Sequence, residues 1–164
     1  MRRIGLLSDT HSYLDPRVLE HLRDVDEIWH AGDIGNAMVL QTLREYKPTR
    51  AVYGNMDGGE VRYSLSEFYR FKVEEVNVLM THIGGYPGRY NPWLLPMFKK
   101  ETPDLFVCGH SHILKVQYDN TWNMLTMNPG AAGMEGWQSV QTLLRFTIDG
   151  KQIKDLEVVE MERK

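Results

Sequence analysis

Short apolar runs alternate with segments of helical periodicity through the first third of the chain. Three apolar runs are each short enough to form a buried strand, and they cover residues 3–8, 27–31 and 50–53. Two segments with apolar positions at helical spacing separate them, at 16–22 and 38–46. Asp15 is suited to cap the first of these helices, and Pro16 to occupy its first position. Strands and helices in this order predict α/β units with a parallel sheet.

Strand patterns dominate the rest of the chain. Further strands are expected at 69–73, 76–80 and 105–108, and a short helix at 93–100. From residue 114 onward only strands are plausible: apolar positions alternate on both sides of Asp119-Asn120, and Asp149-Gly150 joins 140–148 to 153–159 as a two-residue hairpin. We therefore expect the last third to be antiparallel. Residues 84–92 hold three glycines and two prolines, and they predict one long irregular loop.

Composition and charge narrow the class of protein. A chain of 164 residues with 42% hydrophobic content can bury one core, and because no repeat or linker divides it we expect a single domain over residues 1–164. The net charge of -3 argues against long nucleic acid as the main partner. The single cysteine, Cys108, favours a reducing compartment. Because no apolar run approaches the ~18 residues of a membrane span, and the segment before Asp9 is too short for a signal peptide, we expect a cytoplasmic protein without a membrane partner.

Side chains that bind metal ions stand directly after several predicted strands. Seven such residues occur along the chain in this order: Asp9, His11, Asp33, Asn55, His82, His110 and His112. Ligands of α/β sheets gather beyond the carboxyl ends of the strands, so these clusters should converge on one edge. Imidazole, carboxylate and amide donors without a thiolate favour Mn, Fe, Ni or Zn over a Cys-type structural zinc or an all-oxygen Ca or Mg site. Seven donors are enough for two divalent ions, and Mn is our first choice.

The spacing of the donors leaves part of their arrangement open. Asp9 and His11 are two residues apart, so in an extended chain both side chains point to the same side and grip one ion. The same holds for His110 and His112 if their turn is extended; if it curls, the two histidines reach neighbouring ions. Glycines stand next to three donors, where the missing Cβ lets the backbone approach a crowded centre: Gly32, Gly54 and Gly109.

As a set, the chain's motifs resemble those of the calcineurin-like metallophosphoesterase superfamily. The motifs are Asp9-x-His11, Gly32-Asp33, Gly54-Asn55, Thr81-His82 and Gly109-His110-Ser111-His112. The short length and Asn128-Pro129-Gly130 are similar to its small prokaryotic phosphodiesterase branch. The resemblance implies the metallo-dependent phosphatase fold, a four-layered α/β sandwich of two mixed β-sheets flanked by helices. It also implies that one metal is held by Asp9, His11, Asp33 and His112 and the other by Asp33, Asn55, His82 and His110, with Asp33 as the bridge.

The charge of such a centre indicates the substrate. Two divalent ions bring four positive charges and Asp9 and Asp33 return two, so the pocket attracts an anion. In two-metal sites a bridging water becomes hydroxide near neutral pH and can attack a phosphate ester. We expect a binuclear-metal-dependent hydrolase of small phosphodiesters whose catalytic residues are Asp33, Asn55 and His82. A phosphomonoesterase is the second reading. A non-catalytic scaffold is the third, since the superfamily also contains a retromer subunit, although the intact donors argue against it.

Two segments bear on substrate choice. Many family members have histidine after Gly-Asn, but here Met56 stands there and cannot transfer a proton, which favours a diester or an activated aryl ester. Asp57 could replace that acid or could serve only the turn. In the 84–92 loop, Tyr86, Arg89 and Tyr90 could clamp phosphate and stack on a ring, or the loop could be an ordinary exposed or interface loop, which leaves a homo-oligomer open. We take Asn55, Arg89 and Tyr86 as substrate contacts.

His30 precedes the Ala31-Gly32-Asp33 cluster and has two readings. It could support a metal ligand, or it could be a satisfied histidine of the core.

Overall fold

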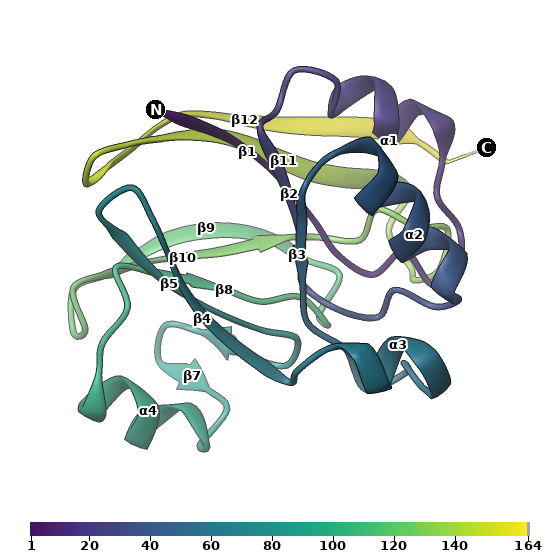
Figure 1. The fold of residues 1–164 in the computed structure, drawn as a ribbon. Coiled ribbons are helices and arrows are strands. Elements are labelled where there is room, and N and C mark those ends of the chain that lie inside the picture. The colour runs from purple at the N-terminus through teal and green to yellow at the C-terminus, as the bar shows by residue number, and fades with distance from the viewer. Residues whose placement is uncertain (164) are drawn as a thin grey trace.

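The first sheet is built from both ends of the chain (Figure 1). In a computed structural model that describes residues 1–163, five strands are hydrogen-bonded in the order β12-β11-β1-β2-β3. Their bounds are Arg2–Leu7 (β1), Glu27–His30 (β2), Thr49–Ala51 (β3), Val140–Asp149 (β11) and Gln152–Glu162 (β12). Because β1 pairs parallel with β2 and antiparallel with β11, the sheet is mixed.

The second sheet contains the middle of the chain. Its five strands have the order β4-β5-β8-β10-β9. They span Phe68–Val73 (β4), Val76–Thr81 (β5), Leu105–Val107 (β8), Leu114–Asp119 (β9) and Met124–Pro129 (β10). The β4–β5 and β9–β10 pairs are antiparallel, whereas β8 pairs parallel with both β5 and β10. This sheet is therefore mixed as well.

Alternating side chains bury both faces of each sheet. Ile4 and Leu6 of β1 pack with Val78 and Met80 of β5 in a core between the sheets. The intervening Leu79 points the other way, into a separate cluster with Phe98. A strand that is buried on both faces reads as a continuous apolar run, as these strands do in the sequence.

Four helices flank the sheets. They are α1 (Pro16–His21), α2 (Ala37–Tyr46), α3 (Gly59–Ser64) and α4 (Leu94–Lys100). Helices α1 and α2 cover the outer face of the first sheet through Val18 and Leu43, and α4 covers the second through Phe98 (Figure 1). The result is the layered α/β sandwich with two mixed sheets that the sequence predicts. Within residues 1–163, none of the helices combines the length and the apolar character that crossing a bilayer requires.

Several boundaries differ from the sequence prediction. The third strand ends at Ala51 rather than at residue 53, because Val52 leaves the sheet to form an isolated bridge with Ser66. Helix α3 has no counterpart in the prediction, because its glycine-rich start masks a helical signal that rests on one buried residue, Val61. The last third is antiparallel within its two hairpins, but these lie in different sheets and β10 also pairs parallel with β8.

The predicted irregular loop at 84–92 contains a small hairpin. Gly85–Tyr86 (β6) and Arg89–Tyr90 (β7) pair antiparallel around Pro87-Gly88.

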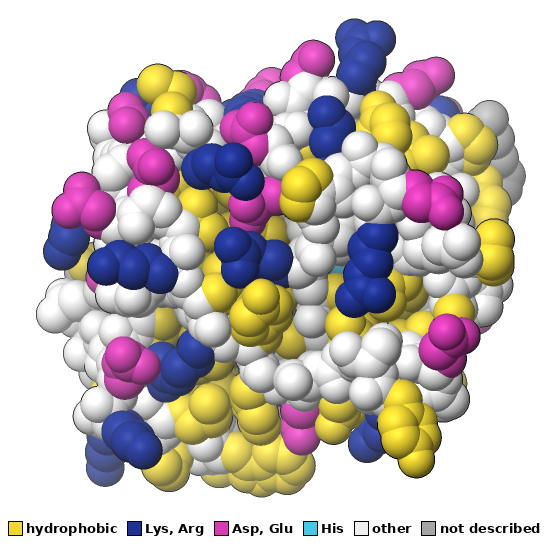
Figure 2. Space-filling model, in the orientation of Figure 1, with side chains coloured by type: hydrophobic (Ala, Val, Ile, Leu, Met, Phe, Trp, Pro, Cys, Tyr) yellow, Lys and Arg dark blue, Asp and Glu magenta, His cyan; other side chains and the backbone are white. Residues whose placement is uncertain are grey.

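On the face shown in Figure 2, basic and acidic side chains are interspersed, so neither positive nor negative charge forms a continuous patch there.

Candidate metal centre

The seven predicted donors lie in loops that follow strands of both sheets. Asp9 and His11 follow β1, Asp33 follows β2 and Asn55 comes after β3, while His82, His110 and His112 follow β5 and β8. Backbone hydrogen bonds join the loops: Asp9 N donates to Gly32 O at 2.9 Å, and Gly109 N donates to His82 O at 2.9 Å. The donors are thus brought together at one end of the two sheets.

The charged donors form two groups of three. Asp9, His11 and His112 make the first group, and Asp33, His82 and His110 make the second; within each, the candidate ligand atoms lie within 4.8 Å of one another. Asn55 extends the second group, because its Oδ1 lies 3.1 Å from His110 Nδ1. The division matches the two ligand sets that the family resemblance implies.

The two groups adjoin through their carboxylates. Asp33 Oδ2 lies 3.1 Å from His82 Nε2 in its own group and 3.7 Å from His11 Nε2 in the other. Asp9 Oδ1 lies 3.2 Å from His112 Nε2 and 3.7 Å from His82 Nε2. Each carboxylate therefore lies 3.7 Å from a histidine of the other group, so the two groups share a boundary at Asp9 and Asp33.

One oxygen of each carboxylate is held by the protein and the other faces the histidines. Asp9 Oδ2 accepts hydrogen bonds from Ser8 Oγ at 2.6 Å and from the His110 amide at 3.1 Å. Asp33 Oδ1 accepts the Met56 amide at 2.8 Å. These bonds fix the orientation of the carboxylates, so that Asp9 Oδ1 and Asp33 Oδ2 are presented to the centre.

Buried polar atoms in this centre have no protein partner. Asp9 Oδ1, His11 Nε2 and His82 Nε2 are buried without a hydrogen bond among the described residues 1–163. Leaving a buried donor or acceptor unsatisfied costs about 1–3 kcal/mol, so a cluster of such atoms is rare unless a ligand satisfies them. Their nature, imidazole nitrogen and carboxylate oxygen, fits divalent transition metals. The residues present therefore fit a pair of metal ions.

The ligand loops are curled rather than extended. Five of the seven donors have a positive φ, at 56° for Asp9, 47° for His11, 55° for Asp33, 72° for His110 and 63° for His112. The left-handed region is sparsely populated by residues with a side chain and costs on the order of 1–3 kcal/mol each. The extended geometry expected for Asp9 and His11 is wrong, although both still belong to one group. The curled alternative holds for His110 and His112, which lie in different groups.

Close backbone approach explains two of the predicted glycines. A Cβ on Gly54 would collide with Asp33 Oδ1, and a Cβ on Gly109 would collide with Ser8 Oγ. Both positions need the absence of a side chain, because the Asp33 carboxylate and the Ser8 hydroxyl occupy that space.

The histidines keep both carboxylates ionised. Burial acts to raise the pKa of Asp9, but pairing with His11 and His112 outweighs it and holds that pKa well below its ordinary value. The pKa of Asp33 is lowered as well: burial acts to raise it, but the hydrogen bond and charge of His82 outweigh burial. In return, Asp9 raises the pKa of His11. Both carboxylates are therefore ionised at neutral pH and available to a cation.

His30 is a satisfied core histidine, and its hydrogen bonds go to the ligand loops rather than to the side chain of a predicted metal ligand. It is fully buried, and burial lowers its pKa to about 4, so the ring is neutral. Its Nδ1 accepts the Gly32 amide at 3.1 Å, which leaves the proton on Nε2, 3.0 Å from Thr10 Oγ1. The Thr10 hydroxyl in turn donates to Ile34 O at 2.8 Å. His30 is a core residue that also joins the loop of Asp9 to the loop of Asp33.

Asp57 serves the turn. Its Oδ2 accepts the amides of Gly54 at 2.9 Å and Ile34 at 3.1 Å, and its Oδ1 accepts the amide of Gly35 at 2.9 Å. The side chain is buried and fully engaged with backbone, so it is not available as an acid for a leaving group. Met56, by contrast, is 69% exposed.

Two residues that support the ligands have no place in the sequence prediction. Ser8 donates to Asp9, and Glu135 Oε2 lies 3.4 Å from His11 Nδ1. The Ser8-Asp9 adjacency is a weak signal for the first contact. The second joins residues far apart along the chain, and nothing local in the sequence marks it.

Two cavities flank the centre. One, of about 460 Å³, is lined by Tyr86 and Arg89 together with Gly109 and His110. The other, of about 170 Å³, is lined by Asn55 and His82 together with Tyr53, Arg62 and Trp93.

Tyr90 lines the same cavity as Tyr86 and Arg89, but its hydroxyl is already engaged. Its hydroxyl donates to Asp119 Oδ2 at 2.6 Å, and its ring packs edge-on against Phe98 and Phe106.

Cys108 is buried, and burial raises its pKa to about 12, so the thiol stays protonated and packs as a small apolar side chain.

Comparisons with known proteins agree with this geometry. Residues 1–151 match the model of the calcineurin-like phosphoesterase superfamily domain. A Methanothermobacter thermautotrophicus protein named "Probable metallophosphoesterase" is 29% identical over 164 residues, which cover 95% of this chain and 91% of that protein.

Solved structures share the fold at low sequence identity. A novel archaeal phosphodiesterase superposes with a TM-score of 0.77 at 21% identity, covering 96% of this chain and 99% of that one. Vps29 from Entamoeba histolytica, complexed with zinc, gives a TM-score of 0.73 at 16% identity, with 98% of both chains covered. At these identities the likeness shows the architecture alone.

Proposed function

We propose that this chain, which belongs to the calcineurin-like phosphoesterase superfamily, hydrolyses small phosphodiesters at a binuclear metal centre. The observation that carries the proposal is the pair of adjoining Asp/His groups, three of whose buried ligand atoms have no hydrogen-bond partner among residues 1–163. Asp9, His11, Asp33 and His112 would hold one ion, and Asp33, Asn55, His82 and His110 the other. The donor set favours Mn, with Ni, Zn and Fe as further candidates. When bound, two divalent ions supply a nucleophile at neutral pH and stabilise the charge that develops during phosphoryl transfer.

The chain's own side chains orient the substrate. Asn55 directs its Oδ1 toward His110, which leaves its amide NH₂ to donate to a phosphoryl oxygen. His82 is held by a hydrogen bond of 2.8 Å between its Nδ1 and Ala31 O, so its Nε2 is the nitrogen that faces Asp33. Arg89 and Tyr86 line the larger flanking cavity, where they can contact one ester arm.

Two features favour a diester over a monoester. Met56 occupies the position where a proton donor is common in the family, and Asp57 is engaged by three amides. Without a general acid, worth about 10²–10⁴ in rate, poor leaving groups react slowly. The two cavities, one beside Asn55 and His82 and the other beside His110, also give both arms of a diester a place.

The test is a comparison of two aryl esters under defined metal. The protein is stripped with chelator, reloaded with Mn, Ni or Zn, and assayed with bis(4-nitrophenyl) phosphate and 4-nitrophenyl phosphate at equal concentrations. A diesterase hydrolyses the first at least tenfold faster in kcat/KM. A reversed ratio favours the monoesterase. If the protein binds two metal equivalents but hydrolyses neither substrate, the result supports a non-catalytic scaffold. The Vps29 structures share this fold.

A further inference from the structure

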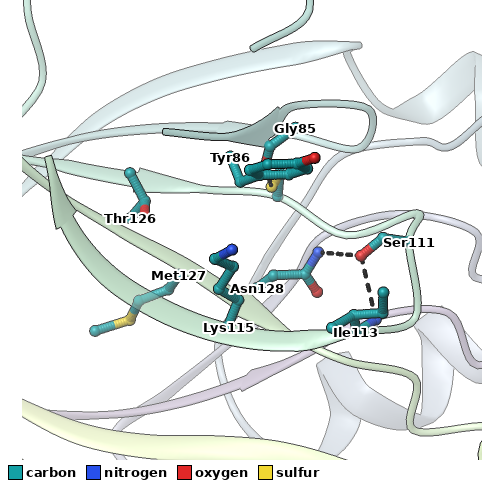
Figure 3. A pocket seen from close by; sticks show the side chains of 9 residues that line it. Gly85, Tyr86, Ser111, Ile113, Lys115, Thr126, Met127 and Asn128 are labelled. Carbon is teal, nitrogen blue, oxygen red and sulfur yellow. Dashed lines mark hydrogen bonds between the residues drawn. The ribbon is translucent and has the colours of Figure 1, made fainter. Parts of the chain in front are cut away.

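A third cavity lies beneath the β6–β7 hairpin (Figure 3). Its volume is about 290 Å³, and it lies between Tyr86 of the hairpin and the strands β9 and β10. It shares Gly85, Tyr86 and Ser111 with the cavity that contains His110. The two cavities therefore form one groove that leads away from the proposed metal site.

The hairpin over this groove is held in place. The Tyr90 hydroxyl is bonded to Asp119 on β9, and the Asn91 amide donates to Gly84 O at 2.9 Å. These contacts hold the hairpin above β9, and Lys115 Nζ of β9 lies 4.5 Å from the centroid of the Tyr86 ring. The Tyr86 ring thus forms one wall of the cavity, and a base that stacks on it takes the place of the Lys115 ammonium, which is then left to donate to the base.

The free polar groups of the cavity are hydrogen-bond donors. Ser111 Oγ already accepts from Asn128 Nδ2 and from the Ile113 amide, both at 3.1 Å, so its own hydroxyl proton is left to donate (Figure 3). Lys115 forms no ion pair with a carboxylate among residues 1–163. The other polar side chains are engaged: Asn128 Oδ1 accepts the Gly130 amide, and the Thr126 hydroxyl donates to Gln117 O.

A ligand that suits this cavity is planar and carries acceptors. The Tyr86 ring offers a stacking face, and Ile113 and Cys108 supply apolar lining. A volume of about 290 Å³ is at the lower limit of the range for small-molecule sites, ~300–1,000 Å³, and admits one ring system rather than several. Lys115 and Ser111 at the rim require carbonyl or anionic oxygen on that ring system.

We propose that this groove binds a nucleobase-bearing arm of the substrate, so that the enzyme acts on nucleotide diesters, with Tyr86 stacking on the base and Lys115 and Ser111 donating to its carbonyl groups. The inference rests on the proposed phosphodiesterase function and adds the class of substrate. Base stacking on an aromatic side chain is typically strong enough to change binding about tenfold or more.

Two substrates with the same scissile bond test the proposal. Thymidine 5′-monophosphate 4-nitrophenyl ester and methyl 4-nitrophenyl phosphate release the same nitrophenol and differ only in the other arm. With the Mn-loaded protein, we expect kcat/KM to be at least tenfold higher for the nucleoside ester. Tyr86→Ala and Lys115→Gln should each lower this ratio severalfold, whereas Tyr86→Phe should keep it because the ring remains.

Tyr118 provides a matched control. It is 51% exposed on the same strand as Lys115 but does not line the groove, so Tyr118→Ala should leave the ratio unchanged. A second readout is calorimetric binding of thymidine 5′-monophosphate and of methyl phosphate to the Mn-loaded protein, where the same variants should weaken only the nucleotide.

The outcomes separate this inference from the function on which it rests. If neither ester is hydrolysed, the phosphodiesterase function fails. If the methyl ester is hydrolysed and the ratio is near one, or if Tyr86→Ala lowers both esters equally, the nucleobase assignment is overturned while the phosphodiesterase stands.

Discussion

Oδ2 of Asp33 lies 3.1 Å from Nε2 of His82, while Oδ1 of the same carboxylate is held by the Met56 amide. The His82 ring is fixed in turn by Ala31 O. Both partners are buried, so neither can turn toward solvent. The pair is therefore oriented by the backbone before metal arrives, and His11 of the other group lies within 3.7 Å of the same oxygen.

Replacing Asp33 should empty both metal positions. In Asp33→Ala the shared carboxylate is lost, so we expect bound Mn to fall from about two equivalents to less than one. Diesterase kcat should fall about 10³-fold, equivalent to ~4 kcal/mol of transition-state stabilisation. Elemental analysis and the bis(4-nitrophenyl) phosphate assay measure the two effects. Asp24→Ala, at a side chain that is 91% exposed, is the control. Full turnover by Asp33→Ala contradicts the bridging assignment.

Metal should stabilise the fold. Three of the candidate ligand atoms are buried without a hydrogen-bond partner among residues 1–163, and five of the seven donors have a positive φ. An ion that binds only the native state raises stability by about 2.7 kcal/mol at a free concentration of 100 Kd. For a chain of this size we expect the melting temperature to rise by about 5–10 °C when Mn is added to chelator-treated protein. Scanning calorimetry checks this. Mg should raise the melting temperature less than Mn does, because a histidine-rich set of donors suits Mg poorly. An unchanged melting temperature under saturating Mn counts against the site.

Introducing histidine at position 56 should favour monoesters. Met56 is exposed, and its amide is already fixed by Asp33, so Met56→His can place an imidazole at the centre without repacking. We expect monoesterase kcat/KM to rise about tenfold or more relative to the diesterase, because a general acid assists a poor leaving group. Met38→His, at a methionine that is 63% exposed on α2, is the matched control. Equal changes in both activities count against a proton-donor role at this position.

Asp57 should matter for stability rather than for proton transfer. Asp57→Asn removes an acceptor from a carboxylate that binds the amides of Gly54, Ile34 and Gly35, so the free energy of unfolding should fall by about 1–3 kcal/mol. Chemical denaturation measures the loss. The ratio of diesterase to monoesterase activity in the remaining folded, Mn-loaded protein should stay as in the parent. A selective loss of one activity would indicate that Asp57 acts as a general acid.

The Asp15 cap should give a pH-dependent contribution to stability. Arg17 holds the pKa of Asp15 down, from its ordinary 3.8 to about 2. Because the folded-state pKa is depressed, the stabilisation is fully present above about pH 4 and is lost as the pH falls toward 2. Asp15→Asn keeps the cap but not the ion pair, and should lose about 2 kcal/mol at pH 7 and little at pH 2. Urea titrations across this range test the sign, and Asp15→Ala adds the loss of the cap.

The sequence determines the local elements and the donors. Neighbouring residues are enough to show the spacing of apolar positions, the start of α1 at Asp15-Pro16 and the turn at Asp149-Gly150. The structure has the elements that these signals predict. The donor set is likewise visible, because each member follows a strand. Elements with a weak local signal were missed, as α3 was, since a six-residue helix after two glycines owes its stability to packing of Val61.

Tertiary structure decides how those donors are used. The sign of φ at Asp9 and His110, the contact of Glu135 with His11 and the engagement of Asp57 all depend on groups that lie far apart along the chain. The groove beneath the β6–β7 hairpin exists because Tyr90 is tied to Asp119, 29 residues away. Local sequence sets which atoms are available; their distances and their desolvation arise only when the two sheets pack, because that packing brings the loops together and excludes water from between them.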